Sequence, residues 1–350
     1  MAGLGAVWLV AIFAVSAAAI WVAGIALSNS TDALDTRLGL GAAIGGLILL
    51  SFATDLPELV ITVTAAASGN ADLAVGNLLG GIAIQTVVLA ACDATVRHER
   101  PLTFLAGSLI PVLEAVLVIT LVVLAMMTMQ LPASANLAGV SPGSLVIVLV
   151  WLGGLLLVRR AQTALPWKAE APESRPGRAP ERKRRGAGPQ PMKQHSTAHV
   201  AGVFAGAALV TAVAGVFVER SGSELAGRLG LSGAVFGATI LAAATALPEL
   251  STGLQSVKIG DHQLAFSDIF GGNAVLMVLF LLADVVSGRP VLPDAQPSDL
   301  WMAGLGAVVT GAYAVGIVMR PRRRFLGIGP DSLAVLAAYA LGIVGLTIIT

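Results

Sequence analysis

The peptide ATDLPEL at residues 53–59 returns, with a single substitution, as ATALPEL at residues 244–250. Each copy places an acid and a proline in the middle of a long apolar stretch. An ionised acid at the centre of a membrane helix costs roughly 2.5–3.5 kcal/mol even on the lenient insertion scale. A feature this unfavourable, present twice, indicates a site that handles ions.

The surrounding composition is that of an all-α, polytopic membrane protein. Of the 350 residues, 56% are hydrophobic and 12% are charged, whereas soluble domains are about one-quarter charged. Ten apolar segments are long enough to cross a bilayer. They cover approximately 4–28, 38–67, 73–96, 102–127, 143–158, 199–218, 230–257, 263–287, 300–319 and 330–350.

A Pro-, Arg- and Lys-rich stretch at 159–197 separates the fifth segment from the sixth, and its composition cannot bury a core. The expected organisation is a first transmembrane half at 1–158, a basic loop at 159–197 and a second half at 198–350. Cytoplasmic loops of membrane proteins are rich in Lys and Arg. With the 159–197 loop in the cytoplasm, ten spans place all 21 Lys and Arg residues on that side except Arg220, Arg228 and Arg289. Both termini of this multi-pass cell-membrane protein then lie outside.

The repeat is longer than the two peptides. Arg37, Gly80-Gly81 and Asp93 return as Arg228, Gly271-Gly272 and Asp284, all at an offset of 191 residues. One repeat therefore covers about 37–93 and the other about 228–284. Five spans, an odd number, lie between the copies, so the two five-helix repeats must insert in opposite orientations. Inverted halves are a transporter architecture with its site at mid-membrane.

Proline predicts a helix break in each copy, because it lacks an N–H and its ring crowds the carbonyl four residues earlier. A carbonyl freed at membrane depth needs a partner, and a cation is one. Thr54 precedes Glu58 by four residues, as Thr245 precedes Glu249, so each hydroxyl shares a helix face with a carboxylate. Each pair thus predicts oxygen ligands on one face of a broken helix.

The next span of each half carries a glycine pair, which allows close approach of helices. Asn77 and Asp268 lie about one turn before these pairs, and the second and third spans are expected to cross there and form an oxygen-lined cage. No Lys or Arg occurs in 38–96 or 229–257. Buried acids without a basic partner are protonated or cation-bound, and oxygen-only ligands suit hard cations such as Ca²⁺ and Na⁺. Such a site alternates between metal ions and protons or Na⁺.

Three further acids have weaker patterns. Glu114, which follows Pro111, is a lone acid within a span and has Leu305 at the offset position. It is expected to be at most a proton-accessible side group. Asp93 and Asp284 lie at span ends and are expected to be solvated.

At the duplicated residues the chain resembles the cation/Ca²⁺ exchanger superfamily, which includes Na⁺/Ca²⁺ and H⁺/Ca²⁺ exchangers. The repeats of that superfamily read G-T-S-L-P-E and, about twenty residues later, G-N-x-x-G-S-N-I-F-[ND]. The corresponding segments here are ATDLPE at 53–58 with GNLLGGIAIQ at 76–85, and ATALPE at 244–249 with SDIFGGNAVL at 267–276. The resemblance implies that Glu58 and Glu249 are central Ca²⁺ ligands and that Thr54 and Thr245 add carbonyl and hydroxyl oxygens. It also implies that the first and sixth spans slide across a stationary bundle.

The chain departs from the superfamily pattern at several ligand positions. Gly81 and Gly272 replace the serines of G-S-N, and Gln85 and Leu276 replace the closing Asn/Asp. Asp55 replaces the serine before L-P-E and compensates for the acid lost at position 276. The changes preserve the divalent site and remove parts of the flanking Na⁺ sites, so Na⁺ and H⁺ coupling stay alternatives. The expected ligand set is Glu58, Glu249, Thr54, Thr245, Asp55, Asn77, Asp268 and Gln85.

The expected function is secondary-active antiport, preferentially of Ca²⁺ against Na⁺ or H⁺, by alternating access. Inorganic cations and the lipid bilayer are the expected partners, with no resident cofactor and no nucleic acid, and the sequence does not specify an oligomeric state. Two alternatives stay open: a proton-coupled exchanger of another cation and a transport-inactive membrane scaffold. Enzymatic activity is not expected, because the chain shows no nucleophile–base pair, phosphate loop or histidine cluster.

Overall fold

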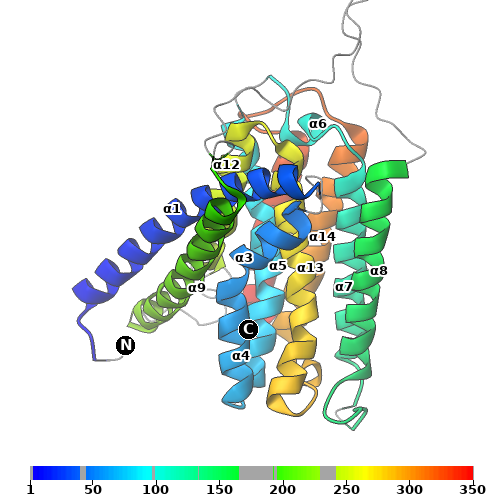
Figure 1. Ribbon diagram of the computed structural model, residues 1–350. Helices are drawn as coiled ribbons and strands as arrows, with labels where there is room; N and C mark the ends of the chain where they lie inside the picture. The colour runs from blue at the N-terminus through cyan, green and yellow to red at the C-terminus, as the bar shows by residue number, and fades with distance from the viewer. Residues whose placement is uncertain are drawn as a thin grey trace, which may run out of the picture.

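The computed structural model describes residues 3–39, 45–96, 99–132, 134–164, 192, 195–228 and 242–349. These residues form helices joined by short turns, and they contain no β-strand beyond two isolated bridges (Figure 1). The expected all-helical fold is confirmed. Most of the predicted 159–197 loop lies outside the described residues, as do 229–241 in the second half.

The first half contains α1 (Ala6–Leu38), the π-helix η1 (Gly45–Leu50), α3 (Ser51–Thr54), α4 (Leu56–Ala67), α5 (Ala71–Thr95), α6 (Leu102–Leu105), α7 (Ile110–Thr128) and α8 (Pro142–Ala164). The second half contains α9 (Thr197–Arg228), α11 (Ala242–Thr245), α12 (Leu247–Ile259), α13 (His262–Ser287), the 3₁₀ helix η3 (Leu292–Asp294), α14 (Pro297–Met319) and α15 (Pro330–Ile349).

Nine membrane spans can be counted among the described residues. Eight are single helices that are long and apolar enough to cross a bilayer: α1, α5, α7, α8, α9, α13, α14 and α15. The ninth is the bent pair formed by Leu47–Thr54 and Leu56–Ala67, whose axes differ by 59°. The predicted span at 230–257 lies partly outside the described residues, and its described part is α11 and α12.

Several span ends differ from the predicted ones. α1 runs to Leu38 rather than residue 28, because the polar residues of its last turns are buried against neighbouring helices. Gly39 caps the helix in the left-handed region at φ 65°. α8 runs to Ala164, past the predicted boundary at 158. The predicted span 102–127 is divided into α6 and α7.

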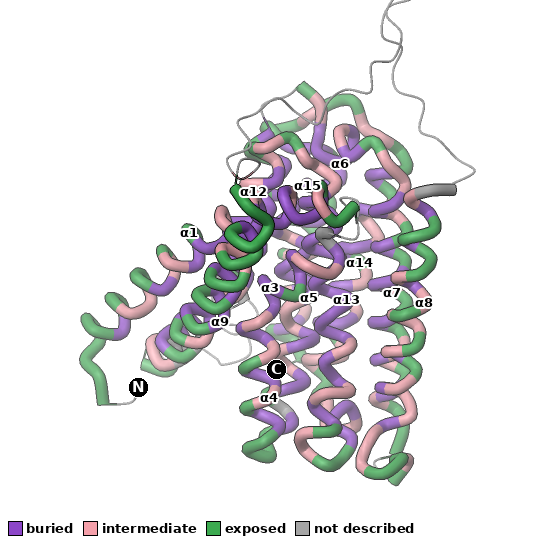
Figure 2. The backbone as a smooth tube through the Cα atoms, in the orientation of Figure 1, coloured by how far each residue is buried: buried purple, intermediate pink, exposed green. Residues whose placement is uncertain are grey.

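The helices form a bundle with one pair set apart. α1 and α9, the first helices of the two halves, pack along each other and lean away from the other helices (Figure 1). α5 and α13 pack against each other at the centre, where the buried residues concentrate (Figure 2). α7 with α8, and α14 with α15, complete the bundle. The duplicated motifs therefore lie beside the most buried helices.

The 191-residue repeat is reproduced in the backbone. Asp55 precedes α4 at φ −80°, ψ 2°, and its counterpart Ala246 precedes α12 at φ −80°, ψ 8°. Asn70 caps α5 at φ −94°, ψ 75°, and Asp261 caps α13 at φ −95°, ψ 77°. Each of these two caps accepts a hydrogen bond from the amide three residues later. The two halves thus share a local fold, and their opposite insertion stays a prediction.

Candidate cation site

Three acids from the two duplicated motifs meet in the interior. One carboxylate oxygen from each of Asp55, Glu58 and Glu249 lies within 4.8 Å of the other two. Their side chains are 1%, 2% and 0% exposed. We refer to these three residues as the acidic cage. The structure therefore brings together side chains that are almost two hundred positions apart in the sequence, as the repeat predicts.

The two prolines position these acids. Pro57 and Pro248 stand in the first turns of α4 and α12, where a missing N–H breaks no helical hydrogen bond. The chain bends at the residue before each new helix, so Glu58 and Glu249 enter the interior at a helix N-terminus. The predicted breaks are confirmed. The helix macrodipole favours negative charge at such an end, which helps to keep carboxylates there.

Six oxygen atoms of the acidic cage and of its neighbours Gln85 and Asp268 have no hydrogen-bond partner within the described structure. They are Asp55 Oδ2, Glu58 Oε2, Gln85 Oε1, both carboxylate oxygens of Glu249, and Asp268 Oδ1. Arg228 pairs with Glu224 and Arg289 with Asp294, so neither of these ion pairs involves the cage acids. Because buried polar atoms are almost always paired, and because these are hard oxygen donors, the set fits a dehydrated hard cation as cargo.

Gln85 and Asn77 connect α5 to the cage. Gln85 Nε2 donates to Asp55 Oδ1 over 3.3 Å. Asn77 Nδ2 donates to the Glu58 carbonyl over 3.3 Å and to Thr62 Oγ1 over 3.2 Å. The second and third spans of the first half therefore cross at the predicted point.

Asp268 and the threonines at positions 54, 245 and 252 were the other oxygen-bearing residues to be placed relative to the cage. Thr252 donates to Asp268 Oδ2, which joins α12 to α13. Thr54 is buried, and its hydroxyl donates to the Ser51 carbonyl over 3.0 Å. Thr245 ends α11 and is half-buried. It lies directly before Ala246, the residue that separates α11 from α12.

The glycines of α13 explain why Asp55 fits. A Cβ at Gly272 would lie 3.0 Å from Asp55 Oδ2, and one at Gly271 would lie 2.6 Å from Leu47 Cα. Gly271 thus allows α13 to approach η1 closely, and Gly272 leaves room for the carboxylate. The serine-to-glycine change at 272 and the serine-to-aspartate change at 55 are therefore complementary: the acid occupies space that a side chain at 272 would need.

Asp93 and Asp284 are buried rather than solvated, with exposures of 1% and 0%. Asp93 accepts from the amides of Leu102 (2.7 Å) and Gly329 (2.6 Å), and Asp284 accepts from the amides of Val291 (2.8 Å) and Ser141 (2.9 Å). Each acid thus joins the third span of one half to the chain just before the last helix of the other. Their shared 191-residue offset was the sequence signal for a common role.

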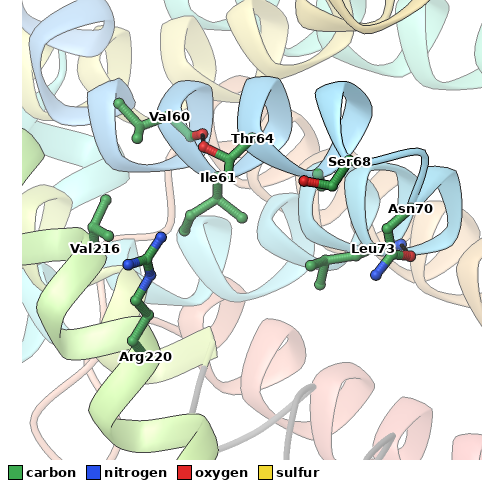
Figure 3. Close-up of a pocket in the computed structure, with 9 residues that line it drawn as sticks. Val60, Ile61, Thr64, Ser68, Asn70, Leu73, Val216 and Arg220 are labelled. Atoms are coloured by element: carbon green, nitrogen blue, oxygen red, sulfur yellow. Dashed lines mark hydrogen bonds between the residues drawn. The ribbon is translucent and has the colours of Figure 1, made fainter. Parts of the chain in front are cut away.

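A cavity of about 230 Å³ lies next to the cage helix α4 (Figure 3). Ile61 and Ala65 line it and follow Glu58 by three and seven residues, so they continue its helix face. Arg220 reaches from α9 towards Ile61 (Figure 3). The cavity therefore lies along α4 between the cage and the α4–α5 turn, with a basic side chain on its wall.

The fold and site define a class: a multi-pass helical membrane protein with a buried carboxylate cage at two helix breaks. The family model described as sodium/calcium exchanger protein matches residues 8–165 and 199–348. The chain belongs to this family, whose members are cation exchangers rather than catalytic enzymes. The expected superfamily is confirmed, and the two matched segments correspond to the two halves.

Curated relatives and solved structures agree with this assignment. The chain is similar to inner membrane protein YrbG of Escherichia coli strain K12, at 26% identity over 311 residues that cover 80% of this chain and 87% of the relative. It is similar to the putative antiporter CaxA of Alkalimonas amylolytica, at 25% identity over 290 residues covering 82% and 84%. The sodium–calcium exchanger NCX_Mj soaked with 10 mM Na⁺ shares the fold, with a TM-score of 0.67 at 13% identity over 98% of this chain and 100% of that chain.

Proposed function

We propose that this protein is an antiporter that exchanges Ca²⁺ for a monovalent ion, H⁺ or Na⁺, at the acidic cage. The observation that carries the proposal is the meeting of three buried carboxylates whose oxygens have no basic partner among the described residues. Leaving such a cluster ionised and empty inside a membrane is unfavourable. A divalent cation or protons neutralise it, and competition between the two is exchange.

The charge of the cage supports this competition. Replacing one Ca²⁺ by two protons leaves the net charge of three carboxyl groups unchanged, so both loaded forms can cross between access states at similar electrostatic cost.

The apolar side chain of Leu276 beside the cage helices favours H⁺ over Na⁺ as the exchanged ion. Leu276 is fully buried, and its Cδ1 would lie 3.2 Å from a Cβ at Gly81. An apolar group thus occupies the side on which the superfamily pattern places further oxygen ligands.

Access to the cage is part of the proposal. We place the approach of an ion along the Glu58 face of α4, which the cavity lines from Val60 onwards, at the end of the bundle that the charge pattern predicts to be outside. α1 and α9 would then move against the more buried helices to open the opposite side. Arg220 on α9 slows cation entry by repulsion, because a charge at the mouth of a cleft changes the local ion concentration.

The test is ⁴⁵Ca²⁺ uptake into proteoliposomes under imposed pH or Na⁺ gradients. Glu58→Gln and Glu249→Gln should each reduce uptake at least tenfold, since each removes a cage charge while retaining side-chain volume. Glu99→Gln is the matched control, because Glu99 is exposed in a loop. Wild-type transport in either cage variant would refute the assignment.

Two experiments separate the alternatives. A competition panel of Ca²⁺, Mg²⁺, Mn²⁺, Na⁺ and K⁺ distinguishes a calcium exchanger from a proton-coupled exchanger of another cation. A transport-inactive scaffold predicts that no cation changes the Tm. A bound cargo at 100 times its Kd should instead stabilise the folded state by about 2.7 kcal/mol.

A further inference from the structure

Glu114 is a buried acid that the cage does not use. It lies in the second turn of α7 and is 0% exposed. Its Oε1 and Oε2 lie 2.8 and 2.9 Å from the hydroxyl of Ser267 on α13, which is also 0% exposed. Both carboxyl oxygens therefore meet a single neutral hydroxyl in a region closed to solvent.

The hydrogen-bond count of this pair favours a protonated carboxyl. A serine hydroxyl offers one proton and accepts through its lone pairs. If Glu114 carries a proton, one of its oxygens accepts from Ser267 and the other donates to it, so every group is satisfied. An ionised Glu114 would share one donor between two oxygens, and among the described residues no basic nitrogen lies within 4.0 Å of it. A buried acid in that position neutralises.

The other charged groups near α7 do not supply a partner. α7 packs against α8, α13, α14 and η3. The titratable groups of these elements are Arg159 and Arg160 on α8, His262, Asp268 and Asp284 on α13, Asp294 on η3, Asp299 and Tyr313 on α14, and Arg320, which caps the C-terminus of α14. Asp284 is bound by two amides, Tyr313 by Ser332, and Asp294 by Arg289. Arg159 and Arg160 are exposed at the end of α8.

Ser267 links Glu114 to the cage region through α13. The next residue, Asp268, bonds Thr252 on α12 through one oxygen and has no partner for the other among the described residues. One turn of α13 therefore presents Ser267 to α7 and Asp268 to α12. One turn before Glu114 on α7, Ile110 packs with Leu47 and Val158 in an apolar cluster.

We propose that Glu114, bonded to Ser267, is a second proton-binding site, separate from the cage, whose proton is exchanged against the transported cation. The proposal rests on the proposed antiport. In the exchange step the Glu114 O–H bond breaks and the proton leaves to water when the apolar cluster opens. Reprotonation from water in the opposite state restores the acid, so no other reactant is needed. Glu114 thereby adds a proton to the two released by the cage, so the Ca²⁺-loaded and proton-loaded forms then differ by one charge, unlike the cage alone.

The experiment compares net H⁺-driven ⁴⁵Ca²⁺ uptake with Ca²⁺/⁴⁵Ca²⁺ exchange at equal pH in proteoliposomes that contain a pH-sensitive dye. Glu114→Gln is the main variant, because an amide reproduces the donor and acceptor of the protonated acid. We expect at least a fivefold loss of H⁺-driven uptake, fewer protons moved per Ca²⁺, and a smaller effect on Ca²⁺/⁴⁵Ca²⁺ exchange. Ser267→Ala should shift the pH profile of uptake and provides a second variant if Glu114→Gln fails to fold.

The possible results distinguish a failure of the proposed role of Glu114 from a failure of the proposed antiport. An unchanged proton-to-Ca²⁺ ratio and pH profile in both folded variants overturns the role of Glu114 while leaving the antiport intact. Equal loss of net uptake and of Ca²⁺/⁴⁵Ca²⁺ exchange also overturns it, because Glu114 would then support the bundle rather than the proton. Wild-type protein that moves no cation under any gradient contradicts the proposed function itself.

Discussion

Adding one methyl group at Gly272 should weaken Ca²⁺ transport through its effect on Asp55. A Cβ there would lie 3.0 and 3.1 Å from the two carboxylate oxygens, whereas ordinary van der Waals contacts begin at 3.4 Å. The carboxylate must then retreat by about 0.4 Å, which exceeds the spread of Ca²⁺–oxygen bond lengths, about 2.3–2.6 Å. An overpacking cost of roughly 1–2 kcal/mol that falls on the Ca²⁺-bound state, where the carboxylate is held against the ion, raises the KM for Ca²⁺ about five- to thirtyfold.

The assay is the Ca²⁺ dependence of ⁴⁵Ca²⁺ uptake by Gly272→Ala in proteoliposomes. Gly80→Ala is the matched control, because a Cβ at that glycine meets nothing within 4 Å, and its KM should equal that of the wild type. In an Asp55→Ser background, where the side chain is shorter, Gly272→Ala should cost less than twofold, since the two substitutions share one contact. A folded Gly272→Ala protein with the wild-type KM would refute the reasoning that Asp55 is a ligand held in place by this glycine.

The remaining predictions concern stability, entry and pH. Gly271→Ala should lower the Tm by the equivalent of about 1–3 kcal/mol, because its Cβ would collide with the η1 backbone; equal thermal melts of Gly271→Ala and wild type would contradict this. Asp284→Asn should destabilise by roughly 1–3 kcal/mol through the lost charge-assisted bonds to two buried amides, again read from the Tm, and an unchanged melt would count against the joining role. Arg220→Gln should lower the Ca²⁺ KM about two- to fivefold at low ionic strength and lose this effect in high salt; a salt-independent change would argue against electrostatic steering. Lower pH should raise the Ca²⁺ KM, since protons compete for the same carboxylates, and Asp55→Asn should flatten that profile; a pH-independent KM in the wild type would exclude competition at the cage.

The sequence predicts the parts of this site that depend on local chemistry and on duplication. Proline chemistry predicts the breaks before Glu58 and Glu249. The absence of basic residues from 38–96 and 229–257 predicts that the acids there have no basic partner. The common offset predicts that the two motifs meet, and the structure brings their acids together.

Long-range contacts could not be predicted in the same way. Asp93 looks solvated because it lies at a span end, yet it binds the amide of Gly329, 236 residues away. Glu114 has no counterpart at the offset position, so nothing in the sequence pairs it with Ser267, 153 residues away. α1 extends past its apolar run because α9 and α12 bury its polar last turns, and no local pattern contains that information.

The most direct test of the central claim is the position of the bound ion. Crystals of the wild-type protein soaked in Sr²⁺, a heavier stand-in for Ca²⁺, should give an anomalous peak within about 2.3–2.8 Å of oxygens from Asp55, Glu58 and Glu249. The peak should disappear in Glu249→Gln. A peak away from these residues, or cage acids each paired with an arginine or lysine, would contradict the account.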